Sequence, residues 1–397
     1  MKDRTVAAQE AGPSALAIAF AGSSAVATAF GMARYSYGLL LPDIQDDLVL
    51  GVSTLGAIGT LAYVTYLFAT LLVTRCIARV GERATVVLGG LLAVAGTIVV
   101  ALATDPVLLG LGVAIAGASA GLVYAPFGEA VQRLPSVVRA RTLATITCGT
   151  GWGVVVAAPI AILAGDAWRA AFFGFAGCAV LSTLLAARTL PGRTASTPSV
   201  LMNAASTSIR TPTAPGRRFP ALPMLAASLL LGLGSASFWT FAVDHVRDAG
   251  LGQTDGRVLL GVAGITSLAS LVAADVVGRL GARPTFVLTA LLEAVAIATI
   301  AVAADHLPAV LIAAATFGAA YNTVCAVTVL WATRIYAGRP SAGLAAATGA
   351  MGIGLLCGPV ASGVLAEFTS LTAALLGGAT IVAISALLAP RGEVIDD

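Results

Sequence analysis

The segment ARVGERATVVL, residues 78–88, returns two hundred positions later as GRLGARPTFVL, residues 278–288. Both copies keep Arg, Gly, Arg, Thr, Val and Leu at the same spacing. The same offset of 200 pairs Arg139 with Arg339, Gly149 with Gly349 and Pro159 with Pro359. A register shared over this distance indicates that the chain consists of two equivalent halves, related by an axis along the membrane normal if the halves lie in a bilayer.

The sequence around these segments is too apolar for a water-soluble protein. Of its 397 residues 58% are hydrophobic and 10% are charged, and the mean hydropathy is +0.96. Ordinary soluble domains carry about 25% charged residues. Uncharged runs long enough to cross about 30 Å of hydrocarbon recur along the chain, and runs of about twenty residues are typical of helices rather than of barrel strands. The sequence predicts an all-α membrane protein.

Twelve transmembrane helices are predicted, six in each half. Their ranges are 14–42, 53–74, 84–103, 107–133, 140–164, 168–188, 220–246, 256–277, 285–303, 308–335, 341–365 and 370–389. The first run is too long for a signal peptide and lacks a cleavage site, so we expect it to be retained as a span. A Ser-, Thr-, Pro- and Arg-rich segment separates the halves. It predicts an N-terminal bundle at 1–189, a cytoplasmic linker at 190–218 and a C-terminal bundle at 219–397.

The distribution of charge predicts the orientation. Basic residues gather in alternate connections, whereas the other connections are rich in aspartate and hold Arg169, Arg247 and Arg257. By the positive-inside rule we expect both termini in the cytoplasm and a multi-pass location in a bacterial inner membrane. The five cysteines lie in or beside apolar segments without C-x-x-C pairing. Neither a disulfide framework nor a metal site is therefore expected, and the composition does not point to nucleic acid.

The repeated segment resembles a motif of the major facilitator superfamily, approximately G-x-x-x-D-R-x-G-R-R between the second and third helices. Residues 74–83 read TRCIARVGER, with Ala78 at the aspartate position, and the second copy has Gly278 there with Asp275 one turn earlier. The resemblance covers nearly the whole chain. It implies two pseudo-symmetric six-helix bundles with a cavity between them, and the helix 1 segment GMARYSYGLLLPDI is similar to a branch of bacterial permeases.

The same resemblance implies a gate at the cytoplasmic end. In the family, arginines and a carboxylate near opposing helix termini act as a charge latch in one state of the transport cycle. The matching residues here are Arg79, Arg83, Asp275, Arg279 and Arg283. The alternative is that these arginines serve only to set the topology.

Arg34 is the charged residue that the first span places within the membrane. It lies about eight residues, or about 12 Å, before the predicted outer end of that helix. An arginine facing lipid there costs at least about 2.5 kcal/mol, so we expect it to face the interior or a wet cavity. It would pair with an anionic substrate or an internal carboxylate. The alternative is a structural ion pair or a hydrogen-bonded strut between helices.

Further polar and aromatic residues lie at membrane depth in both halves. The predicted substrate-binding residues, with Arg34, are Tyr37, Tyr63, Tyr124, Trp152, Phe238, Trp239, Tyr321 and Asn322. Such side chains supply stacking surfaces and a few hydrogen bonds to a partly apolar ligand. Taken singly, each such residue is more often a packing residue than a ligand contact. Their shared depth in the two halves is what groups them, and Tyr37 is expected on a face similar to that of Arg34.

Two membrane carboxylates and two histidines need separate interpretations. Glu129 is one helical turn before Arg133, which favours either a local ion pair or a proton-coupling acid. Glu293 is in the middle of a helix, where a lipid-facing carboxylate would be costly, so we expect it to point inward without an assigned role. His245 and His306 fall in predicted outer loops and are expected to be exposed.

These features predict a secondary active transporter that moves a small organic, anionic solute by alternating access with proton coupling. Its expected partners are the solute, protons and the lipid bilayer, and a monomer is expected. No cofactor is expected, since the sequence has no phosphate-binding loop and ATP binding is unsupported. An efflux pump for drugs or lipids is the second interpretation. A membrane-embedded enzyme or a receptor is the third, and an enzyme would need a polar cluster at one depth that the sequence does not show.

Overall fold

The computed structural model describes residues 14–192, 221–336 and 340–390. Within these ranges twelve helices are long and apolar enough to cross a membrane. The prediction of twelve spans is therefore confirmed, and their boundaries agree with the expected ones to within several residues. Most of the predicted linker at 190–218 lies outside the described residues.

The first six spans contain ten helical elements, because spans 1 and 5 are each interrupted. In chain order they are α2 (Ala15–Val26), η1 (Ala27–Met32), α3 (Ser36–Leu39), α4 (Leu41–Leu48), α5 (Val52–Val80), α6 (Glu82–Ala101), α7 (Pro106–Gln132), α8 (Ser136–Thr147), α9 (Gly149–Ala164) and α10 (Trp168–Thr189).

The last six spans contain a break in span 8 and a short 3₁₀ turn after span 12. The elements are α12 (Ala221–Asp248), α13 (Gln253–Thr266), η2 (Ser267–Val272), α14 (Ala273–Leu280), α15 (Ala282–Val302), α16 (Leu307–Ile335), α17 (Pro340–Phe368), α18 (Leu371–Ser385) and η3 (Ala386–Leu388).

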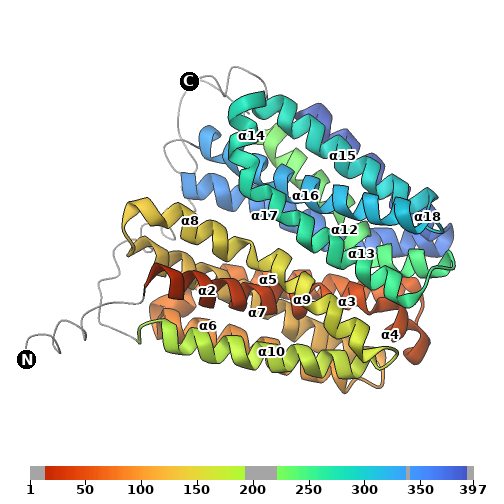
Figure 1. The fold of residues 1–397 in the computed structure, drawn as a ribbon, viewed down its shortest axis with the longest axis horizontal. Coiled ribbons are helices and arrows are strands. Elements are labelled where there is room, and N and C mark those ends of the chain that lie inside the picture. The colour runs from red at the N-terminus through yellow and green to blue at the C-terminus, as the bar shows by residue number, and fades with distance from the viewer. Residues whose placement is uncertain (1–13, 193–220, 337–339, 391–397) are drawn as a thin grey trace, which may run out of the picture.

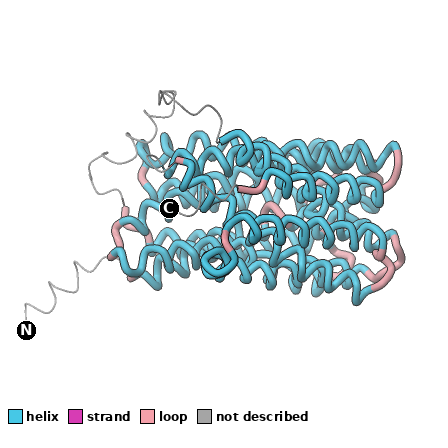
Figure 2. Tube along the Cα trace, turned by 90° about the horizontal axis from the view of Figure 1, so that it is seen from above, coloured by secondary structure: helices cyan, strands magenta, loops and turns pink. Residues whose placement is uncertain are grey.

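The helices form two groups that lie side by side. Figure 1 shows α2 to α10, coloured red to yellow-green, below α12 to α18, coloured green to blue. The helices run along the long axis of the molecule, and the connections gather at its two ends (Figure 2). The groups meet where α5 packs on α17, where α9 packs on α13, and where α12 packs on α3 and α4.

The repeated segments form the same turn twice. Gly81 separates α5 from α6 with φ of 87°, and Gly281 separates α14 from α15 with φ of 86°. A residue with a Cβ rarely adopts this backbone conformation, so glycine is required at both turns. The internal repeat in the sequence therefore encodes a repeated turn in the structure.

The first span changes its helical period just before Arg34. The element η1 is a π-helix, in which the Ala33 amide donates to the Thr28 carbonyl at 2.8 Å and the Tyr35 amide to the Phe30 carbonyl at 3.0 Å. Such π-bulges often occur at functional sites because they shift the following side chains around the helix axis. Residues 33–35 follow directly, so this break positions Arg34 and Tyr35.

The two halves approach closely at the end that holds the 1–2 and 7–8 connections, which the charge distribution predicts to face outward and which we call the outer end. There, a Cβ placed on Gly38 of α3 would lie 2.1 Å from the Trp239 carbonyl oxygen of α12. At the opposite, predicted cytoplasmic end, α8 packs chiefly on α2, α7 and α9, and α14 on α15 and α16. These partners belong to the same half as the helix that they contact.

Candidate functional site

Arg34 lies inside a cage of aromatic rings from spans 1 and 2. Its guanidinium carbon is 4.1 Å from the ring centre of Tyr63 and 4.4 Å from that of Tyr66. Tyr35 and Phe30 lie at 5.5 and 5.8 Å. A cation over aromatic faces at these distances is attracted by the ring quadrupoles, and more strongly when water is excluded. We call these four residues the aromatic cage.

The charge of Arg34 has no counterion in the described part of the chain. The residue is 6% exposed, and neither its Nε nor its Nη2 has a hydrogen-bond partner. No carboxylate forms an ion pair with it among the described residues. The structural ion pair that the sequence left open is therefore not what holds Arg34, whereas its side-chain hydrogen bond to Tyr63 joins spans 1 and 2, as the alternative of a hydrogen-bonded strut expects. A buried guanidinium with unpaired N–H groups is instead equipped to bind an anion.

Tyr35 connects this cage to aromatic residues of the other half. Its ring stacks on Trp239 at 4.8 Å between centres, and Trp239 contacts Tyr321 edge-on at 5.7 Å. Phe317 stacks on Tyr321 at 5.5 Å and on Phe238 at 3.6 Å. We call Tyr35, Trp239, Tyr321, Phe317 and Phe238 the cross-half cluster. The Nε1–H of Trp239 is buried without a partner, so each half contributes an unpaired donor near Tyr35.

Four of the predicted binding residues lie outside these two groups. Tyr37 donates its hydroxyl to the Leu55 carbonyl at 2.9 Å, so it joins spans 1 and 2 and does not share a ligand-facing position with Arg34. Tyr124 shares a hydrogen bond with Thr147 at 2.8 Å. Asn322 donates within its own helix to Gly318, and Trp152 is 46% exposed on α9. Tyr63, Phe238, Trp239 and Tyr321 are the predicted residues that join Arg34 or its neighbour Tyr35.

Glu129 does not form the local ion pair that its spacing suggested. Arg133 donates instead to Glu82, at the start of α6. Glu129 is half-buried near the predicted cytoplasmic end of α7, beside that pair. The predicted ion pair between Glu129 and Arg133 is therefore wrong. The other interpretation, that Glu129 is a proton-coupling acid, stays a prediction.

The predicted cytoplasmic latch is not formed in this conformation. Arg79, Arg83, Asp275, Arg279 and Arg283 are all exposed, and no ion pair joins any of them to another described residue. Their gating role remains a proposal for a different state of the molecule.

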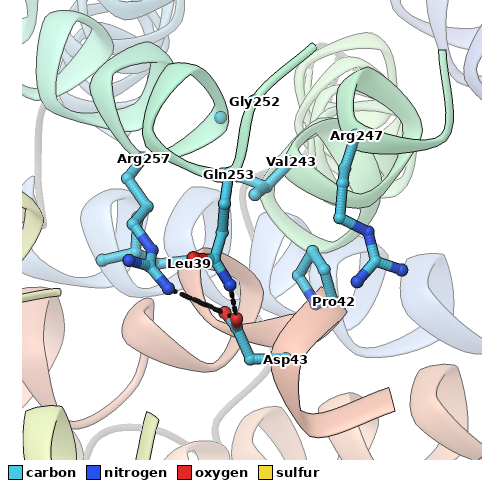
Figure 3. Close-up of a pocket in the computed structure, with 9 residues that line it drawn as sticks. Leu39, Pro42, Asp43, Val243, Arg247, Gly252, Gln253 and Arg257 are labelled. Atoms are coloured by element: carbon cyan, nitrogen blue, oxygen red, sulfur yellow. Dashed lines mark hydrogen bonds and ion pairs between the residues drawn. The ribbon is translucent and has the colours of Figure 1, made fainter. Parts of the chain in front are cut away.

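An ionic contact closes the outer end instead. Arg257, on α13, is 1% exposed, and its Nη2 lies 3.1 Å from Oδ2 of Asp43 on α4. Gln253 donates to the other oxygen of Asp43, and Figure 3 shows this carboxylate held between the two side chains. Arg257 also donates to the Ala161 carbonyl at 2.7 Å and the Gly165 carbonyl at 2.8 Å. We call Asp43, Gln253 and Arg257 the outer latch.

Exposed ion pairs surround the outer latch. Arg247 bonds Asp46 at 2.6 Å across the two halves, and Arg169 bonds Asp47 at 2.7 Å. A surface cavity of about 540 Å³ lies beside them, lined by aspartates 43, 46, 47 and 166 among others. The expectation that His245 is exposed in a loop was wrong. It is buried in α12, where its Nε2 contacts the Ala301 carbonyl at 3.1 Å.

The outer latch yields a first prediction. Burial raises the pKa of Asp43, and the nearby Arg257 offsets this only in part. Asp43 therefore becomes neutral at a higher pH than an ordinary aspartate, and lowering the pH should weaken the latch. Asp43→Asn should open the outer end at neutral pH, because removing one partner of a buried pair costs about 3–5 kcal/mol.

The measurement is the distance between spin labels at Val49→Cys and Ala249→Cys, in a background without the native cysteines. Acid should lengthen it in wild type, whereas Asp43→Asn should give the long distance at every pH. Asp46→Asn is the matched control, because exposed ion pairs contribute about 0–1 kcal/mol. If the distance between the spin labels changes neither with pH nor in Asp43→Asn, the latch does not hold the outer end closed.

Several residues of the candidate site escaped the sequence interpretation. Tyr66 is three residues after Tyr63 on a helix, so its shared face could have been recognised. Tyr35 could not, because a π-helix precedes it and changes the face on which it lies. Asp43 was placed beyond the end of the first span and Arg257 at the outer edge of the eighth, whereas the helices continue past both. Among the described residues, no group of three or more His, Cys, Asp or Glu is suited to hold a metal.

Comparison with known sequences gives one family and one curated relative. The family model described as "Uncharacterised MFS-type transporter YbfB" matches residues 26–390. A chloramphenicol resistance protein from Streptomyces lividans is 30% identical over 376 residues, which cover 91% of this chain and 92% of the relative.

Comparison with solved structures gives the same fold. The nucleoside transporter NupG superposes with a TM-score of 0.72 at 12% identity, over 93% of this chain and 98% of NupG. A D-xylose–proton symporter superposes with a TM-score of 0.72 at 16% identity, over 94% of this chain and 96% of the symporter. At these identities the superpositions establish the fold and leave the solute open.

Proposed function

The chain belongs to the major facilitator superfamily, and from this premise we propose that it is a secondary active transporter of a small organic anion that works by alternating access. The observation that carries the proposal is the buried guanidinium of Arg34, whose Nε and Nη2 have no hydrogen-bond partner and whose neighbour Tyr35 stacks on Trp239 of the other half. Burying a charge without a partner is costly, so a residue retained in this way is a functional-site candidate.

The surroundings of Arg34 suit a carboxylate attached to an apolar body. The unpaired N–H groups of Arg34 belong to the first half, and the unpaired Nε1–H of Trp239 belongs to the second. An anion that accepts from both would bring the halves together around itself. The rings of the cage and the cross-half cluster would contact the rest of the ligand, as stacking surfaces in ligand sites commonly do.

The proposal includes proton coupling and the orientation with both termini in the cytoplasm. Glu129 remains a candidate proton-exchanging group, since Arg133 forms its ion pair with Glu82 and not with Glu129. At the predicted cytoplasmic end of α7, it would exchange protons with the inner solution. Arg79, Arg83, Asp275, Arg279 and Arg283, at the predicted cytoplasmic ends of their helices, would then close that end when the outer latch opens.

An exporter of uncharged amphipathic drugs is the second candidate function. The observation that favours it is the relative from S. lividans, which is named for chloramphenicol resistance and is aligned over most of both chains. Expelling a drug is one physical route to resistance. A neutral drug does not require a buried cation, however, so this candidate leaves the charge of Arg34 without a function.

Counterflow in proteoliposomes separates the two candidates. Vesicles loaded with unlabelled benzoate, an aromatic carboxylate, should accumulate labelled benzoate transiently, because a carrier exchanges its ligand across the membrane without an energy source. Chloramphenicol serves as the uncharged probe. Exchange of benzoate supports the anion proposal, and exchange of chloramphenicol alone would replace it with the exporter.

The indole N–H of Trp239 gives a second prediction. Trp239→Phe keeps an aromatic ring but removes the donor, so the half-saturating benzoate concentration should rise about tenfold, the cost of one hydrogen bond to a charged group. Trp168→Phe is the matched control, because Trp168 also has a buried, unpaired Nε1–H but lies at the outer end of α10. Equal effects of the two substitutions would show that the donor of Trp239 has no special role.

A further inference from the structure

Glu293 is a fully buried carboxyl group that has no assigned role in the proposed transport site. It lies on α15 with 0% exposure and faces α12 and α16. From α12 it meets Ser235, and from α16 Tyr321 and Cys325 lie within electrostatic range. The described part of α18, which also packs on α15, holds no ionisable side chain. No described Arg, Lys or His forms an ion pair with Glu293.

The hydrogen bonds of Ser235 fit a neutral Glu293. Its Oγ is 2.5 Å from the Leu231 carbonyl oxygen and 2.5 Å from Oε1 of Glu293. A carbonyl oxygen can only accept, and a serine hydroxyl has a single hydrogen to donate. If Ser235 donates to Oε1 of Glu293, the carboxyl group needs no hydrogen, whereas if Ser235 donates to Leu231, the contact with Glu293 needs a hydrogen from the carboxyl group. Glu293 as a neutral carboxylic acid, donating to Ser235 Oγ, satisfies both contacts.

Burial leads to the same conclusion independently. An ionised carboxylate in an apolar interior is costly without a cation or several donors, and such a group takes up a proton instead. The second oxygen, Oε2, is buried without any partner. From the hydrogen count and this isolation we propose that Glu293 binds the proton that is transported with the anion, in addition to any exchange at Glu129.

The placement of Glu293 and Arg34 gives the direction of coupling. Tyr321 of the cross-half cluster lies within electrostatic range of Glu293, and it contacts Trp239, which stacks on Tyr35 next to Arg34. An anion at Arg34 and an ionised Glu293 would be like charges in a medium of low dielectric constant. Anion binding therefore favours the protonated acid, by about tenfold for charges a few side chains apart. Proton and anion should bind together, which describes a symporter.

This inference rests on the proposed function for its coupling partner, but the protonation of Glu293 can be tested without a ligand. In the purified full-length protein at neutral pH, infrared spectroscopy should detect the carbonyl stretch of a buried carboxylic acid. Glu293→Gln should remove this band, whereas Arg34→Gln, which disables the anion site, should retain it. Ser235→Ala should shift its frequency by removing the hydrogen-bond partner, and it provides a second variant if Glu293→Gln does not fold.

Proton uptake tests the coupling itself. Adding benzoate to weakly buffered wild-type protein should take up protons, and Glu293→Gln should reduce this uptake at least tenfold while benzoate counterflow persists. The exposed Glu367→Gln is the matched control and should behave as wild type. A band unchanged by Glu293→Gln, or undiminished uptake in that variant, would overturn the proposal. If wild type shows the infrared band but does not exchange benzoate, the anion is instead rejected as the coupled solute.

Discussion

Arg34→Gln should reduce benzoate counterflow by at least a hundredfold. Glutamine can still donate hydrogen bonds but carries no charge, and losing one partner of a buried, charge-assisted contact costs about 2–5 kcal/mol, or roughly thirty- to several thousandfold in binding. The loss should appear as weaker binding and not as misfolding, since the glutamine amide can still donate a hydrogen bond to Tyr63, the cage residue that Arg34 bonds. Transport activity per correctly folded molecule is the quantity to compare.

Two further variants sharpen this prediction. Arg34→Lys keeps the charge but replaces a planar fork with a point charge, so it should retain part of the activity. Arg169→Gln is the matched control, because Arg169 also lies over an aromatic ring, 4.2 Å from the centre of Trp168, but at the outer surface. Near-wild-type exchange by Arg34→Gln, or an equal loss in Arg169→Gln, would contradict the assignment.

Gly38→Ala should abolish transport by preventing closure of the outer end. The added methyl group would lie 2.1 Å from the backbone oxygen of Trp239 and 3.3 Å from its carbonyl carbon. Backbone cannot move aside as a flexible side chain can, so α3 and α12 could not approach as they do here. Because the clash joins the two halves and not helices of one half, each bundle should still fold.

The spin-label pair at positions 49 and 249 measures this effect as a longer distance than in wild type, together with loss of benzoate counterflow. Gly128→Ala is the matched control, since a Cβ there meets no atom within 4 Å. Closure and transport in Gly38→Ala at the wild-type level would show that the close approach of α3 and α12 is not required for the cycle.

The architecture could be predicted from sequence because it depends on local quantities. Span lengths follow from runs of apolar residues, and the two-half organisation follows from a repeat whose glycines, Gly81 and Gly281, adopt the same left-handed turn. Arg34 could be identified for the same reason, since its depth follows from its position in an apolar run. Likewise Glu293 was expected to point inward, as it does, because the alternative is exposure to lipid.

The partners of these residues could not be predicted, because they depend on packing between spans. The π-helix before Arg34 brings Tyr35 to the cage and leaves Tyr37 bonded to Leu55. Tyr35 thus lies beside Arg34, where Tyr37 was expected. The gate was expected in the cytoplasmic loops, where the family motif lies. In this conformation the ion pairs Arg257–Asp43 and Arg247–Asp46 join the two halves at the outer end, and a single conformation shows only one of the two gates.

Equilibrium binding of benzoate and of its uncharged analogue benzamide to purified protein tests the central claim, that the unpaired charge of Arg34 selects an anion. The account predicts that wild type binds benzoate at least tenfold more tightly than benzamide, and that Arg34→Gln binds both equally weakly. Tight binding of benzamide by wild type, or an unchanged preference for benzoate in Arg34→Gln, would contradict it.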